Sequence, residues 1–127
     1  MALIADGAFD AALNYIKNGL DRLDICTQQP ANATAARTNP AGGNSLGNEV
    51  ISSANTTGPQ VGDVDGRELQ INAIDDGDVT ATGTATHWAI SNSTVLLAAG
   101  TLQSSQAVTS GNKFTLGVFD ITIRDAT

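Results

Sequence analysis

The sequence predicts a mainly β protein: an antiparallel β-sandwich or jelly-roll-like domain with a short N-terminal helix and a long irregular loop. Between residues 79 and 90, Thr occupies nearly every even position until Trp88 and Ile90 continue the same parity, as in a strand with one buried face. Turn-forming residues separate the apolar runs from residue 67 to residue 124. Because 127 residues suit one domain, we expect a single β-rich domain over residues 1–127, with its β core at 67–124.

A short amphipathic helix is expected over residues 6–18. Its apolar side chains recur at the helical spacing i, i+3, i+4 and i+7, at Phe9, Ala12, Leu13 and Ile16. Asp6 stands where a capping residue belongs, and Gly19 where a left-handed residue would end the helix. We expect the helix to cover a sheet; docking on a partner protein is the alternative.

The next element is a strand over residues 22–27. Alternation places Leu23 and Ile25 on a buried face, with Asp24 and Cys26 on the opposite face. Cys26 is the only cysteine, so an intrachain disulfide is impossible and nothing indicates an oxidising compartment. Without a nearby histidine or basic cluster in the sequence, Cys26 is expected to be an inert small residue.

Residues 28–48 are rich in Pro, Ala, Asn, Gly and Thr and predict a flexible arm. Loops longer than about 12 to 15 residues are usually functional or disordered, so the arm either orders against a neighbouring subunit or remains a mobile loop. A strand is possible at residues 49–52. A second loop is expected at 53–66, around Gly58 and Pro59.

Four strands are expected beyond this loop, at residues 67–74, 78–90, 94–102 and 113–124, joined by turns at 75–77, 91–93 and 110–112. Such short links predict an antiparallel meander. In the last strand the apolar parity flips beside Gly117, from Phe114, Leu116 and Val118 to Phe119, Ile121 and Ile123. The flip predicts a β-bulge or a strand that passes from one sheet to the other; burial on both faces is the alternative.

Composition and charge exclude several classes of function. Charged residues are 15% and aromatic residues 4% of the chain, and the net charge is −7 with a pI near 4.2. The six basic residues are scattered, so a nucleic-acid partner is not expected. No apolar run nears the roughly 20 residues that cross a bilayer, and no signal peptide is recognisable, so no membrane partner is expected. Because small side chains bury little area, association with other copies would add to a modest core.

Candidate chemistry is sparse, and no catalytic, cofactor-binding or metal-binding residue is predicted. His87 is the only histidine, which excludes a zinc site built on several histidines, and it is expected to be structural. Two acidic groups could offer oxygen ligands to a weak calcium site: Asp75, Asp76 and Asp78, and Asp63 with Asp65. Neither has the spacing of an EF-hand loop, so both are interpreted as turn residues.

Four segments carry a resemblance to a known family: residues 20–30, 83–90, 110–114 and 119–123. They resemble small proteins encoded among the structural genes of tailed bacteriophages, whereas residues 31–60 match least well. The resemblance implies a virion structural protein and carries no functional residue over to this chain. Within that class we favour a capsid decoration or cement protein that docks on the head surface after synthesis in the host cytoplasm.

The expected partners are the major capsid protein and other copies of the chain. A homotrimer is favoured because head shells offer threefold sites. Two alternatives remain open: a tail, neck or fibre-associated virion component, and a receptor-binding or carbohydrate-binding module. The second would need exposed aromatic platforms, for which Trp88 and Tyr15 are the only Trp and Tyr. An enzyme is not expected.

Overall fold

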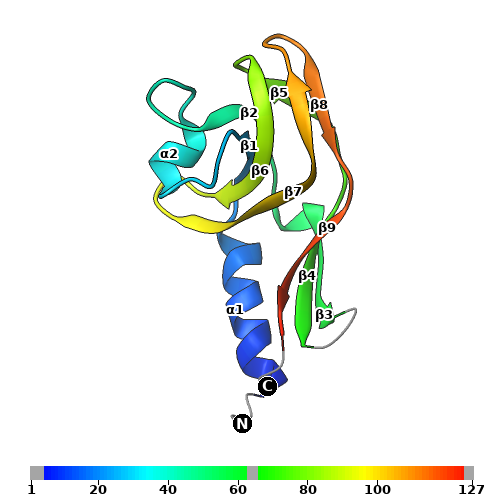
Figure 1. Ribbon diagram of the computed structural model, residues 1–127. Helices are drawn as coiled ribbons and strands as arrows, with labels where there is room; N and C mark the ends of the chain where they lie inside the picture. The colour runs from blue at the N-terminus through cyan, green and yellow to red at the C-terminus, as the bar shows by residue number, and fades with distance from the viewer. Residues whose placement is uncertain (1–4, 63–65, 125–127) are drawn as a thin grey trace.

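The computed structural model describes residues 5–62 and 66–124, and it confirms the mainly β, antiparallel, sandwich-like fold. A six-stranded sheet has the order β7-β6-β1-β2-β5-β8, and a three-stranded sheet has the order β3-β4-β9 (Figure 1). The helical elements are α1 (Asp6–Gly19), α2 (Ala33–Arg37) and the 3-10 turn η1 (Ser53–Asn55). The strands are β1 (Arg22–Cys26), β2 (Ser45–Val50), β3 (Thr56–Val61), β4 (Arg67–Ile71), β5 (Ile74–Val79), β6 (Gly83–Ser91), β7 (Leu96–Val108), β8 (Lys113–Leu116) and β9 (Phe119–Ile123).

The predicted N-terminal helix is confirmed as α1, which packs against β3 and β4 of the smaller sheet (Figure 1). Phe9 and Leu13 are buried at this contact, as their spacing predicts. Both predicted caps are wrong. Asp6 already lies inside the helix and caps nothing, and Gly19 is its last helical residue, followed by the extended Leu20.

Residues 28–48 contain α2 and the first part of β2, so the prediction of a flexible arm was wrong for these two parts of the segment. Asn32 caps α2 by accepting a hydrogen bond from the Ala35 amide at 2.8 Å, and both Ala33 and Ala36 are buried. β2 then lies between β1 and β5 inside the larger sheet. The alanines that suggested a loop are suited to close packing, because a small side chain lets a helix approach a sheet closely.

The prediction of strands and turns after residue 48 is only partly correct. The strand expected at 49–52 overlaps the end of β2, and η1 and β3 occupy residues 53–61 of the loop expected at 53–66, of which residues 63–65 lie outside the described part of the chain. The turn expected at 75–77 is instead part of β5. Gly77 is required there by packing: a Cβ atom on it would lie 2.2 Å from the ring of Phe114 on the paired strand β8.

The strands are antiparallel but do not form a meander. The pairs β1-β2, β3-β4 and β6-β7 join neighbours in the sequence, whereas β1-β6, β2-β5, β5-β8 and β4-β9 join distant segments. Local turn signals identify hairpins, but they contain no information about such long-range pairs. The turns expected at 91–93 and 110–112 do join β6 to β7 and β7 to β8.

The parity flip beside Gly117 is confirmed as a change of sheet. β8 belongs to the six-stranded sheet and β9 to the three-stranded sheet. Phe114 and Leu116 are buried, and the half-buried side chains of β9 pack against the same core: Phe119, Ile121 and Ile123. Val118 departs from the prediction, because it lies between the two strands and is 54% exposed.

Both faces of β1 are buried, so the expected exposed face of this strand was wrong. Leu23 and Ile25 belong to the main core, and Asp24 and Cys26 are also inaccessible on the opposite face. α2 covers that side, where its Ala36 packs with Cys26 and Ala89. No helix among the described residues has the length and apolar content to cross a bilayer.

Candidate functional site

His87 lies in β6 and is half-buried, where its Nδ1 atom is 2.8 Å from the Thr86 hydroxyl. Within residues 5–62 and 66–124, no group of three or more His, Cys, Asp or Glu side chains is placed to hold a metal ion.

The acidic groups considered as calcium ligands do not converge. Asp75, Asp76 and Asp78 are exposed on β5, and Asp78 forms an ion pair with Lys113. Asp75 and Asp76 line a shallow hollow of about 200 Å³ with Glu49. Asp63 and Asp65 lie outside the described residues. Among the described residues these carboxylates are not placed to hold a metal ion together, so they form an exposed acidic edge of β5.

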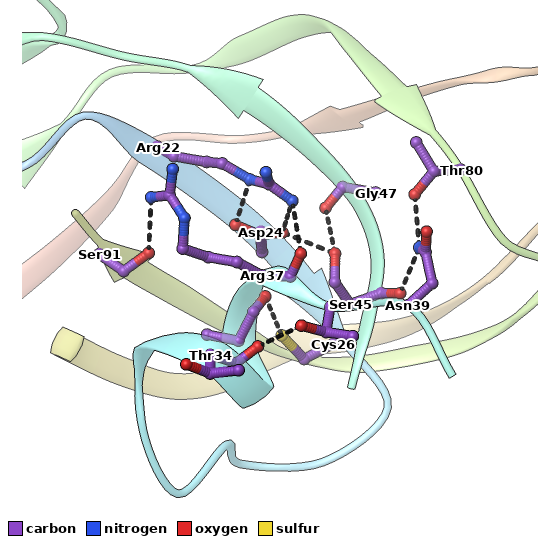
Figure 2. Close-up of polar contacts among 12 residues, drawn as sticks. Arg22, Asp24, Cys26, Thr34, Arg37, Asn39, Ser45, Gly47, Thr80 and Ser91 are labelled. Atoms are coloured by element: carbon purple, nitrogen blue, oxygen red, sulfur yellow. Dashed lines mark hydrogen bonds and ion pairs between the residues drawn. The ribbon is translucent and has the colours of Figure 1, made fainter. Parts of the chain in front are cut away.

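A buried polar cluster stands where α2 crosses the larger sheet (Figure 2). Asp24 is fully buried and accepts hydrogen bonds from Arg22 Nε at 2.9 Å, Arg22 Nη2 at 2.7 Å and Ser45 Oγ at 2.6 Å. Burial raises the pKa of the Asp24 carboxyl, and the hydrogen bonds from Arg22 and Ser45 oppose this rise. Asp24 therefore links β1 to β2 through its contact with Ser45.

Arg37 extends this cluster from α2 to the sheet. It donates to Asp21 Oδ1 at 2.8 Å. Figure 2 shows its other two contacts, in which it donates to Ser91 Oγ at 3.2 Å and its carbonyl accepts from Arg22 at 3.2 Å. Every buried side-chain nitrogen and oxygen among the described residues has a hydrogen-bond partner. The cluster thus holds α2 against the larger sheet, and its buried polar groups already have hydrogen-bond partners within the protein.

Cys26 lies beneath this cluster, where burial disfavours reactivity at its thiol. Its side chain is inaccessible, and its thiol lies 3.9 Å from the Ala36 carbonyl. Burial, with a further contribution from the charge of Asp24, raises the pKa of the Cys26 thiol from 9.0 to about 12. A protonated, enclosed thiol is a poor nucleophile.

This shift predicts a loss of stability in alkaline solution. Between pH 9 and pH 12 the unfolded thiol ionises while the folded thiol stays protonated, so the unfolded state is stabilised relative to the folded state as the pH rises. From pH 8 to pH 10, wild type should lose about 1.4 kcal/mol more unfolding free energy than Cys26→Ala. Urea unfolding of both proteins at the two pH values measures the difference; parallel losses would contradict it.

The most distinctive surface is formed by the segment from β6 to the end of β7. No Asp, Glu, Lys or Arg occurs between Asp78 and Lys113, although the whole chain has 13 acidic and six basic residues. Thr82 just before β6 and the exposed residues of β6 and β7 carry hydroxyl, amide or small side chains: Thr82, Thr84, Thr101, Gln103, Ser104, Ser105 and Ala107. We call this set the uncharged surface. Sequence reasoning missed it, although the gap between Asp78 and Lys113 is visible in the sequence itself.

The uncharged surface borders a hollow of about 220 Å³ at the end of the larger sheet. Of the described residues, those that line it include no charged one: Trp88, Thr101, Leu102, Gln103, Ser104, Gln106, Leu116, Gly117, Val118 and Phe119. Trp88 and Phe119 lie 4.6 Å apart between ring centroids, at 37°. Hydroxyl and amide groups around an apolar interior are suited to contact with another uncharged protein surface.

Trp88 does not provide the open ring face that a sugar-binding module needs, whereas Tyr15 is a single exposed aromatic residue. Trp88 is only 9% exposed, and its indole lies so close to Gly100 that a Cβ atom there would be 2.7 Å away. With Phe119 packed against the ring as well, Trp88 is a core residue. Tyr15 is 64% exposed on α1, where it is the only aromatic residue on the helix's exposed side.

Comparison of the chain with protein-family models, curated proteins and solved structures finds no match.

Proposed function

We propose that the protein is a structural component of a tailed-bacteriophage virion, where it docks on the head shell as a decoration or cement protein. The resemblance of residues 20–30, 83–90, 110–114 and 119–123 to phage structural proteins supports the choice of virion. The observation that carries a docking role is the uncharged surface of β6 and β7 on a domain whose net charge is −7. The proposed partner is the major capsid protein.

Charge distribution is the physical basis of this proposal. Burying a charged group in an interface requires its desolvation, so the centres of protein interfaces are depleted of charged residues. The uncharged surface can lose its water without that penalty. The acidic residues on the rest of the chain keep free copies apart and in solution before they dock.

Cryo-electron microscopy of the virion that encodes this chain tests the proposal. We expect ordered copies at symmetric positions on the outer surface of the head, with β6 and β7 directed toward the shell. Density confined to the tail or neck would favour the tail alternative. Virions without the protein would overturn the assignment altogether.

A charge placed on the uncharged surface should weaken docking. Thr84 is exposed on β6, and Thr84→Glu adds a carboxylate that docking would have to desolvate. We expect affinity for heads that lack the protein to fall by at least about tenfold, which corresponds to about 1.4 kcal/mol. Binding to such heads is measured by cosedimentation over a range of protein concentrations.

Thr122→Glu is the matched control, because Thr122 is also exposed but lies on β9 of the smaller sheet. This variant makes the same change in net charge and should bind as wild type does. Equal losses for both variants would mean that overall charge, and not the uncharged surface, governs docking. No loss for Thr84→Glu would place the docking surface elsewhere on the domain.

A further inference from the structure

The larger sheet curls but does not close. β7 and β8 are its two terminal strands, and neither is paired with the other along its backbone. One side-chain hydrogen bond joins them, from Gln106 Nε2 to the Thr115 carbonyl at 3.2 Å. The hollow of about 220 Å³ lies along this line, which we call the seam.

A bulge in β7 forms one side of the seam. Ala85 of β6 pairs with Gln106 and His87 pairs with Thr101, so residues 102–105 leave the ladder between these pairs. Such bulges bend a strand and redirect its side chains. Here they carry Leu102, Gln103 and Ser104 to the hollow.

The junction of β8 and β9 forms the other side of the seam, and it carries an unusual apolar side chain. Val118 lies at the hollow and is 54% exposed. Large exposed apolar residues are few among the described ones, and the others lie on α1, β2 and β3: Tyr15, Val50 and Val61. An apolar projection therefore stands at the rim of a hollow whose interior includes Trp88, Leu116 and Phe119.

We propose that the seam is a contact between two copies of this chain, related by a twofold axis, in which Val118 of each copy enters the hollow of the other. A projection and a hollow on one surface are self-complementary, which is the property that a twofold contact requires. The fit is sterically possible. At about 30 Å³ per carbon atom, by analogy with a water molecule in the liquid, the three side-chain carbons of valine fill less than half of the hollow.

Charge favours a second copy as the occupant. Two chains that each carry −7 repel one another over most of their surfaces, so they can approach closely only where charges are absent. The described residues that line the seam provide such a place, because none of them is charged.

The seam goes beyond the proposed function, because it names a twofold contact between copies where the sequence favoured a homotrimer, and its test needs no virion. We expect the purified protein at about 100 μM, in the range of weak interfaces, to have twice its 12.9 kDa chain mass in analytical ultracentrifugation. Raising the salt concentration should strengthen the dimer, because salt screens the repulsion between the acidic surfaces. A monomer at every concentration and salt level would overturn the proposal, and so would a trimer.

Val118→Asp should abolish the dimer, because the carboxylate would enter an apolar hollow. We expect a monomer mass under conditions in which wild type is dimeric. Val61→Asp is the control. Val61 is 71% exposed on β3, and its substitution makes the same change in charge away from the seam. A dimer that survives Val118→Asp, or one that is lost equally in Val61→Asp, would overturn the seam as the contact.

Disulfide trapping tests the proposal without adding a charge. Copies with Ser104→Cys mixed with copies with Val118→Cys should form a linked dimer under mild oxidation, because Ser104 lines the hollow that receives Val118. Cys26 does not compete, since it is fully buried. A mixture of Ser104→Cys with Val61→Cys should remain unlinked; equal linking in the two mixtures would contradict the proposed geometry.

Discussion

Replacing Asp24 with alanine is expected to lower the free energy of unfolding by about 3 kcal/mol, because breaking a buried ion pair leaves its partner without compensation. Arg22 would lose both of its carboxylate contacts, and Ser45 would lose the acceptor 2.6 Å from its hydroxyl. The expected loss lies at the lower end of the range of unfolding free energies lost when buried ion pairs are broken, because the Arg22 side chain is 22% exposed and can be partly hydrated. Urea denaturation at pH 7 measures the change.

Asp78→Ala is the matched control for this prediction. Asp78 also pairs with a cation from a strand position, but the side chains of Asp78 and Lys113 are 65% and 60% exposed. Ion pairs at such positions contribute about 1 kcal/mol or less. Similar losses in the two variants would contradict the importance of burial at Asp24.

The sign of the pH dependence at Asp24 follows from its raised pKa. At pH values between the unfolded and the folded pKa, the folded state holds more protons, so the contribution of Asp24 to stability falls as the pH rises. Asp24→Asn cannot titrate. The stability of wild type relative to Asp24→Asn should therefore increase as the pH falls toward the ordinary pKa of an aspartate.

The secondary-structure signals that succeeded are those that arise within one element. The spacing of Phe9 and Leu13 predicts α1, and the change of parity beside Gly117 predicts the passage from β8 to β9. The failures involve contacts between distant segments. Ala33 and Ala36 are small and read as loop residues, but they are buried because α2 lies on the larger sheet. Likewise, the sequence around Gly77 is typical of a turn, but in the structure Gly77 lies within β5 beside the ring of Phe114.

The candidate surface is predictable from the sequence only in part. The absence of charge between Asp78 and Lys113 can be read directly, and it would have indicated an uncharged hairpin. The hollow could not be predicted, because it depends on the bulge in β7 and on its approach to Leu116 and Phe119. These are consequences of strand pairing over long distances along the chain, for which one sequence contains no local signal.

Trp88→Ala should reduce the free energy of unfolding by about 3 to 5 kcal/mol, which is the cost of removing a large aromatic side chain from a core. The indole packs between Gly100 and the ring of Phe119, so its loss leaves a cavity that the backbone cannot readily fill. Tyr15→Ala is the aromatic control. Because Tyr15 is 64% exposed, its loss should change stability by no more than about 0.5 kcal/mol.

The same pair of variants separates a structural domain from a sugar-binding module. A core tryptophan affects ligand binding only through folding, whereas a binding platform can be removed with little change in stability. Thermal unfolding and a glycan-array measurement on both variants test this difference. If Trp88→Ala unfolded as wild type does while it lost binding to a glycan, the indole would be a ligand contact, and the receptor-binding alternative would replace the docking role proposed for β6 and β7.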